Sequence, residues 1–279
     1  MNLEGDLAMK NRIIGALAVL GVGIVVLVSM PTPAAGQAAA NLPRTPDKKP
    51  DLNGLWQAMS TAHWDIQDHS ARQGPVIALG AAYSVPAGMG VVVGNEIPYK
   101  PEALARKKEN QANALTLDPE IKCYMPGVPR ATYMPYPFHI VQTPSVVMFA
   151  HEFAGAARTI YINGKMEAPV DAWMGWSNGR WDGDTLVIDT TGFNGQSWFD
   201  RAGNYQTETL HVVERITPMT RDVLNYEVTI EDPAIYTRPW KMQMPLYRRM
   251  DRNAMLMEYK CVEFAEETMY GQLKKPGTN

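Results

Sequence analysis

Two histidines stand next to charged side chains in arrangements that allow acid–base chemistry. His151 is followed directly by Glu152, and Arg158 comes shortly afterwards, on what we expect to be the adjacent strand. A histidine with a carboxylate nearby can act as a general acid or base, and a guanidinium can hold an anion. The alternative is a structural role, in which His151 and Glu152 only form hydrogen bonds at the end of a strand and pack against a turn. We take His151 and Glu152 as candidate catalytic residues.

His211 is the third candidate catalytic residue, in a segment that also holds Glu214 and Arg215. In an extended strand His211 and Arg215 share one face and Glu214 points to the other, so the three line one cavity only if a bulge intervenes. We expect Arg215 to pair with Glu227 across two strands. That pair is either a solvated surface pair or, if enclosed, an anchor for a ligand carboxylate or carbonyl.

Tryptophans and methionines supply apolar lining for a hydrophobic or ring-shaped ligand, although such residues also serve as core and edge cover. The candidate ligand-binding residues are Arg158, Trp176, Arg180, Arg215, Tyr226, Glu227 and Trp240.

No signature of a metal or cofactor accompanies these residues. The spacing of Asp182, Asp184 and Asp189 does not match a calcium loop, and Asp182 is explained by a turn. Neither cysteine has a second Cys or a His at metal-binding spacing. Nucleophile elbows, zinc-protease helices, phosphate loops and dinucleotide fingerprints are missing from the sequence. We therefore expect no metal and no cofactor.

The elements that position the candidates are predicted to be strands. The 22 glycines and 21 prolines fall between short apolar runs, which is typical of an all-β protein. Asp182-Gly183 between Trp173–Trp181 and Asp184–Thr191 is a strong hairpin signal. Other expected strands are Asp51–Trp56, His139–Thr143, Ser145–Phe153, Arg158–Ile162, Thr209–Ile216, Val223–Ile230, Lys241–Met250 and Ala254–Val262. Such an antiparallel meander closes most simply into an up-and-down β-barrel.

An inserted region at about 99–137 interrupts the strands of a single β domain over 51–279. Pro101–Ala112 is predicted to be a short helix, because it holds good helix formers behind a proline. Asp118–Pro137 is rich in proline and is expected to be an extended segment on the surface.

The N-terminus has the pattern of a bacterial secretory signal. Lys10 and Arg12 precede the apolar run Ile13–Met30 and a small-residue exit, which predicts a signal peptide over 1–36, with Met9 as an alternative start. An uncleaved membrane helix is the alternative. Residues 37–50 have the composition of a disordered linker. We expect a periplasmic or secreted protein.

Because exported proteins meet an oxidising environment, Cys123 and Cys261 are candidates for a disulfide that links the middle of the chain to its last strand. The alternative is two buried free thiols. With 26 basic and 29 acidic residues, the chain has no excess positive charge that would attract nucleic acid or anionic lipid. We therefore expect a small-molecule partner, no nucleic acid, and membrane contact only through an uncleaved signal segment.

Several stretches resemble a large family of exported bacterial proteins without a settled activity. They are 50–56, 123–130, 179–193, 210–215 and 232–240, of which 179–193 reads GRWDGDTLVIDTTGF. The resemblance implies export and no particular reaction. Gly54-Leu55-Trp56 is also similar to the Gly-x-Trp entry of lipocalins, in which the Trp plugs one end of the barrel. This looser similarity implies a barrel with a ligand cavity.

Three functions are compatible with these patterns. The first is a lipocalin-like barrel that binds a small, largely apolar molecule. The second is a cofactor-independent isomerase, lyase or hydrolase of the same shape, with His151 or His211 as the base. The third is an envelope-assembly partner that docks through Asp118–Pro137.

Overall fold

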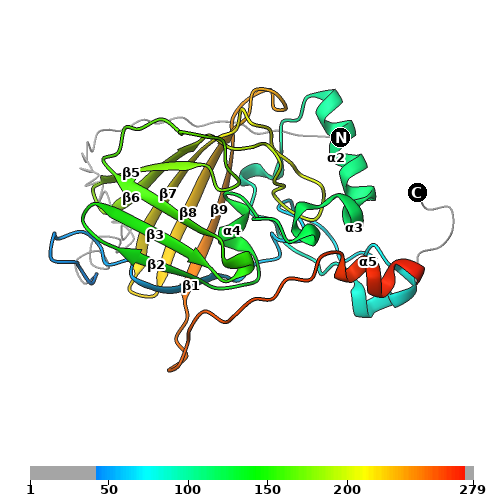
Figure 1. The fold of residues 1–279 in the computed structure, drawn as a ribbon, viewed down its shortest axis with the longest axis horizontal. Helices are drawn as coiled ribbons and strands as arrows, with labels where there is room; N and C mark the ends of the chain where they lie inside the picture. Colours follow the sequence, from blue (N-terminus) through cyan, green and yellow to red (C-terminus); the bar gives the residue numbers. More distant parts are fainter. Residues whose placement is uncertain (1–41, 274–279) are drawn as a thin grey trace, which may run out of the picture. The chain divides into compact units, whose positions relative to one another are not determined.

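Nine strands form a closed β-barrel in the computed structural model, which describes residues 42–273. The strands are β1 (Gly54–Ala58), β2 (Phe138–Gln142), β3 (Val146–His151), β4 (Ala157–Ile162), β5 (Trp176–Asp182), β6 (Thr185–Thr191), β7 (His211–Thr220), β8 (Val223–Glu231) and β9 (Trp240–Arg248). The predicted all-β barrel is confirmed (Figure 1). The predicted signal peptide lies outside the described residues.

Strand neighbours follow the chain order, and β9 pairs with β1 to close the ring. All pairs are antiparallel except β4 with β5, which run parallel over Ile160–Ile162 and Ser177–Gly179. The barrel is therefore mostly antiparallel, and the expected meander is interrupted at this one pair. The crossover over residues 163–175 is long enough to return the chain to the start of β5 before it pairs.

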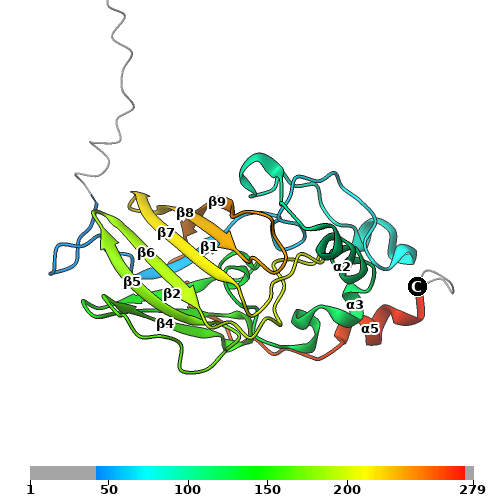
Figure 2. The same cartoon turned by 90° about the horizontal axis from the view of Figure 1, so that it is seen from above.

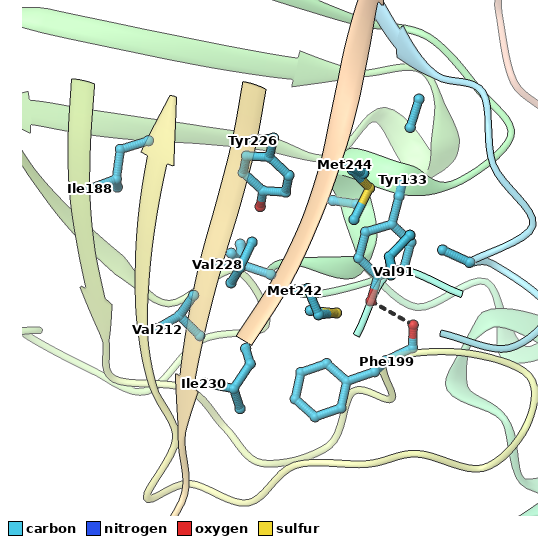
Figure 3. Close-up of a cluster of buried hydrophobic side chains, with 14 of the residues drawn as sticks. Val91, Tyr133, Ile188, Phe199, Val212, Tyr226, Val228, Ile230, Met242 and Met244 are labelled. Carbon is cyan, nitrogen blue, oxygen red and sulfur yellow. Dashed lines mark hydrogen bonds between the residues drawn. The ribbon is translucent and has the colours of Figure 1, made fainter. Parts of the chain in front are cut away.

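Alternating side chains fill the barrel. In β8, Leu224, Tyr226, Val228 and Ile230 point inward and are at most 1% exposed. Facing strands add Ile188 and Val212 from β6 and β7, as well as Met242 and Met244 from β9, and Figure 3 shows these apolar side chains together. Burial of this surface is the main stabilising contribution of the barrel.

Trp56 from β1 is fully buried near the point where the barrel closes. Its indole Nε1 donates to the Leu52 carbonyl at 2.8 Å. The Arg248 guanidinium lies 4.3 Å from the ring centroid, and Arg248 Nη1 donates to the Asn53 carbonyl at 2.7 Å. The first and last strands are thus joined by side chains as well as by the backbone ladder.

The helical segments lie beyond one end of the barrel, where Figures 1 and 2 both place α2, α3 and α5. The helices are α2 (Pro101–Ala112), α3 (Ala114–Leu117), α4 (Arg130–Tyr133) and α5 (Ala265–Tyr270), with short 3-10 turns that include η3 (Pro119–Lys122). The predicted helix Pro101–Ala112 is confirmed. No helix within residues 42–273 is long and apolar enough to cross a membrane.

The core continues from the barrel into this helical end. Tyr133 of α4 is buried, and its hydroxyl donates to the Phe199 carbonyl at 2.8 Å, the contact dashed in Figure 3. At the start of α2, the Lys100 amide donates to the Ile235 carbonyl at 2.9 Å. The helical end and the barrel therefore share packing and hydrogen bonds.

The prediction of an extended surface segment over Asp118–Pro137 was wrong. This segment holds η3 and α4, and Asp118, Arg130 and Tyr133 are each 1% exposed. Proline here begins a helical turn instead of preventing one, because the first turn of a helix has unpaired amides in any case. Much of the segment packs into the core, whereas Tyr124 and Met125 remain exposed.

Two other segments also differ from expectation. Residues 254–262 form no strand, because β9 pairs with β1 and leaves no partner for a further hairpin. The described part of the predicted linker, residues 42–50, is a turn closed by the Arg44–Pro50 bridge, and Arg44 pairs with Asp184 at 2.8 Å.

The disulfide between Cys123 and Cys261 is confirmed. Cys123 follows η3, and Cys261 lies in the C-terminal strap, by which we mean residues 249–273, and not in a last strand. Close to the bond, the Phe264 amide donates to the Ile121 carbonyl at 2.8 Å. The strap is thereby fixed against the helical end of the molecule.

Candidate functional site

A buried ionic network lies at the helical end. Arg130 is 1% exposed and binds Asp118 through both Nη atoms, at 2.8 and 2.9 Å. Arg130 Nη2 also donates to Glu120 at 2.5 Å. The other side of the Glu120 carboxylate accepts from Arg201 Nε and Nη2, at 3.0 and 2.9 Å. We call Asp118, Glu120, Arg130 and Arg201 the ionic network.

Local sequence positions two members of this network. Asp118 precedes Pro119 and caps η3, since its Oδ1 accepts from the Glu120 amide at 2.9 Å. The turn of η3 then directs the Glu120 side chain toward Arg130 and Arg201. Burial raises the pKa of Glu120, but its neighbours, Arg201 foremost, outweigh burial and hold that pKa well below its ordinary value.

His63 lies against the ionic network, with Nε2 at 3.6 Å from Glu120 Oε1. The side chain is 6% exposed, and Nδ1 has no hydrogen-bond partner within the described part of the chain. Burial lowers the pKa of His63 to about 3, although Glu120 opposes the shift. The imidazole is therefore neutral at pH 7.

A pocket of about 150 Å³ opens beside the ionic network and is called the helical-end pocket below. Its apolar walls come from the loop before α2, from α3 and from η3, and include Trp64, Tyr83, Val85, Leu115 and Ile121. Its polar groups come from Arg72, Asp118, Arg201 and Glu266. Mostly apolar walls with a few convergent polar groups are typical of small-ligand sites.

Arg201 connects the pocket to the network. Its guanidinium carbon lies 4.9 Å from the Trp64 ring centroid, and Nη1 is 3.0 Å from a Glu266 carboxylate oxygen. The Tyr83 hydroxyl donates to the other oxygen of Glu266. Burial raises the pKa of Glu266. Because Glu266 belongs to α5, the C-terminal strap supplies one wall of the pocket.

A second buried charge cluster lies inside the barrel. Arg158 Nη1 and Nη2 donate to Glu214 at 2.6 and 2.8 Å, and the Tyr226 hydroxyl donates to the same carboxylate at 2.5 Å. The Arg158 guanidinium also lies 4.8 Å from the Phe149 ring centroid. Burial raises the pKa of Tyr226 well above its usual range, so the phenol stays protonated. Each charge in the interior is thus paired.

The candidate catalytic residues do not come together. His151 is 4% exposed and packs on Phe138, with ring centroids 5.3 Å apart. Neither ring nitrogen makes a hydrogen bond of ordinary geometry in residues 42–273, and burial lowers the pKa of His151 to about 3. Glu152 instead accepts from the Met257 amide of the strap at 2.8 Å. β3 ends at His151, and Glu152 begins the turn that leads into Phe153–Gly155, so the two side chains point in different directions.

His211 lies on the outer face of the barrel with a side chain 35% exposed, and Nε2 is 3.1 Å from Asp189. Arg215 and Glu227 are register partners, as expected, but also on the outer face. The ion pair of Arg215 goes to Asp182, at 2.8 Å. Neither Arg215 nor Glu227 can anchor a ligand inside the barrel.

The remaining ligand-binding candidates are spread over three regions. Arg158 and Tyr226 belong to the barrel cluster, and Arg180 is exposed on β5. Trp176 stacks on Tyr161, with centroids 4.9 Å apart, on the outer face. Trp240 is 3% exposed and meets Phe199 edge-on. Of these candidates, Arg158 and Trp176 line the same hollow, and the others lie elsewhere.

Sequence reasoning missed the ionic network and the helical-end pocket. A signal was present in Asp118-Pro119, since Asp at the N-cap followed by Pro at the first helical position is a helix-start pattern. No comparable signal marks Arg201, because its partners are distant in sequence. Within residues 42–273, no group of His, Cys, Asp or Glu is placed to hold a metal ion.

Comparison with known families finds no family model that matches this chain, and comparison with curated proteins finds no match either. The fold and the site together define a class of protein: a nine-stranded β-barrel with a packed interior and a small pocket at its helical end.

Proposed function

We propose that this protein binds a small ligand with one ring and an acidic group in the helical-end pocket. The observation that carries the proposal is Arg201, which reaches the pocket while Glu120 holds it from behind and Trp64 covers its face. A guanidinium held in this way is pre-organised to bind a carboxylate.

The volume of the pocket limits the ligand. About 150 Å³ matches an apolar cavity that accommodates one benzene ring. Trp64, Leu115 and Ile121 supply apolar walls for such a ring. The sequence predicted a small, largely apolar or ring-shaped ligand, and we retain this ligand class. We place the ligand in the helical-end pocket because large side chains fill the barrel.

The acidic group of the ligand would take the place of Glu266. Burial raises the pKa of Glu266, so this carboxylate is easier to neutralise than an ordinary surface glutamate. A ligand carboxylate at Arg201 would then restore the pair that Glu266 gives up.

The cellular setting belongs to the same proposal. The secretory pattern of residues 1–36 and the Cys123–Cys261 disulfide support a periplasmic or secreted bacterial protein. The motif over 179–193 supports membership of the exported family that it resembles.

Titration of benzoate, monitored by isothermal calorimetry or saturation-transfer NMR, tests the proposal. We expect benzoate to bind and the uncharged benzamide to bind at least about tenfold more weakly, a difference that corresponds to one charge-assisted contact. Ala114→Trp places a large side chain in the pocket lining and should abolish binding. Ala112→Trp, on the exposed end of α2, is the matched control.

Equal binding of benzoate by both tryptophan variants would refute the proposed location. Absence of benzoate binding by the folded wild-type protein would refute the ligand class.

A further inference from the structure

A second hollow lies on the outer face of the barrel, away from the helical-end pocket. Its volume is about 580 Å³, within the range of roughly 300–1,000 Å³ typical of ligand sites. One wall is β4 from Ala157 to Tyr161, which includes the buried Arg158, together with the start of β5. The other wall is the crossover over 171–175 with Met125 and Asn194. We call this the crossover groove.

The groove exists because β4 and β5 pair over only three residues. The ladder joins Ile160–Ile162 to Ser177–Gly179, so the first half of β4 has no backbone partner on the β5 side. The chain crosses over this gap before it enters β5. The only parallel pairing in the described barrel thus creates the hollow.

Aromatic rings line the groove. Tyr161 and Trp176 stack with centroids 4.9 Å apart and planes inclined by 20°. On the opposite wall, Trp173 contacts Tyr124 with centroids 5.0 Å apart. Aromatic rings present a negative π face, which attracts the partially positive C–H groups on the flat face of a sugar ring.

Polar groups lie among these rings. The indole Nε1 of Trp176 is buried and has no hydrogen-bond partner within residues 42–273. Asp171 is exposed and makes no ion pair in the same range. Thr159 adds a hydroxyl to the lining, and Asn194 adds an amide whose Oδ1 accepts from the Gln196 backbone amide at 3.1 Å. A purely apolar ligand would leave Trp176 Nε1 without a partner, whereas a ligand hydroxyl would accept its hydrogen bond.

We propose that the crossover groove binds a saccharide built of pyranose rings with equatorial substituents. Such rings have an apolar face for Tyr161, Trp173 or Trp176 and a rim of hydroxyls for Asp171 and Asn194. The groove is open at the surface and larger than the helical-end pocket, which suits an oligosaccharide better than a single small ring. This inference is independent of the ligand proposed for the helical-end pocket.

Calorimetric titration of cellotetraose, chitotetraose and xylotetraose into the purified protein tests the inference. We expect at least one of them to bind, and Trp173→Ala and Trp176→Ala each to weaken that binding by about tenfold, the effect of losing one stacked aromatic. Tyr247→Ala removes an outer-face aromatic of β9 that does not line the groove and should leave binding unchanged.

Ala114→Trp should also leave saccharide binding unchanged, which separates this test from that of the helical-end pocket. The inference is overturned if none of the three saccharides binds, if binding survives both tryptophan substitutions in variants that melt like the wild type, or if Tyr247→Ala weakens binding to the same extent.

Discussion

The buried pair between Arg158 and Glu214 shows how this fold tolerates charge in an apolar interior. The carboxylate accepts two guanidinium donors and the Tyr226 hydroxyl, so its desolvation is offset by three short contacts. The arrangement is stable only while both partners are present, because either charge alone would be buried without compensation.

Glu214→Gln should therefore lower the free energy of unfolding by about 3–5 kcal/mol, since it leaves the Arg158 charge unpaired. Urea denaturation measures the change. Arg158→Met combined with Glu214→Leu should recover much of the loss, because the pair is then replaced by apolar groups. A cost for Glu214→Gln no larger than that for Glu227→Gln on the outer face would contradict this view of the interior.

His63 and His151 make stability depend on pH. Burial lowers the pKa of each in the folded protein to about 3, below the value of about 6.5 expected when unfolded. The unfolded state binds more protons between these values, so stability should fall as pH falls from 6.5 toward 3, by roughly 1.4 kcal/mol per pH unit for each histidine.

His151→Phe, which matches the neighbouring Phe138 and Phe149 rings, should flatten that decline. The measurement is urea denaturation at a series of pH values. The difference in unfolding free energy between variant and wild type gives the contribution of His151, because the carboxylates contribute equally to both proteins. A His151→Phe curve parallel to that of the wild type would contradict the assignment.

For single residues, the sequence predicted which side chains of a strand share a face, but not which of the two faces lies inside the barrel. Strand alternation correctly separated Glu214 from His211 and Arg215. It did not show which face curls inward, and Arg215 was favoured as an anchor although Glu214 lies in the interior. The apolar neighbours Val212 and Ile216, which share the face of Glu214, were the available signal.

Among the elements, locally determined ones were predictable. Pro101–Ala112 starts with proline and contains helix formers, and the turn between β5 and β6 holds Gly183 at φ 59°, a conformation that glycine adopts without strain. The parallel β4–β5 pair and the missing strand over 254–262 depend instead on which strands meet in space. Alternation within one strand carries no such information.

The C-terminal strap depends on its disulfide. The bond between Cys123 and Cys261 closes a long loop, with a sequence separation of 138, which restricts the unfolded chain. Replacing both cysteines by serine should lower stability by about 2–5 kcal/mol in urea denaturation. A change below about 0.5 kcal/mol would show that the strap is held by its other contacts alone.

Loss of the disulfide should also strengthen benzoate binding, because α5 carries Glu266, which competes with the ligand carboxylate for Arg201. The affinity of the double serine variant for benzoate, measured at a temperature where the variant remains folded, should rise relative to wild type. Unchanged affinity would mean that α5 keeps its position without the bond.

At the scale of the whole molecule, the barrel serves as a packed scaffold for sites outside it. Trp56, Phe138, Phe149 and Tyr226 are each fully buried in its interior. The helical-end pocket and the crossover groove lie where the regular sheet is interrupted or ends. A barrel could be predicted from hairpin signals, but the location of its pockets could not, because they are formed by segments distant in sequence.

The most direct test of this account is the location of bound benzoate, obtained by mapping amide chemical-shift changes on the full-length protein. We predict changes at Trp64, Leu115 and Ile121 around the helical-end pocket, with Val228 and Met242 inside the barrel unaffected. Changes concentrated at Val228 and Met242 would place the ligand inside the barrel and contradict the account.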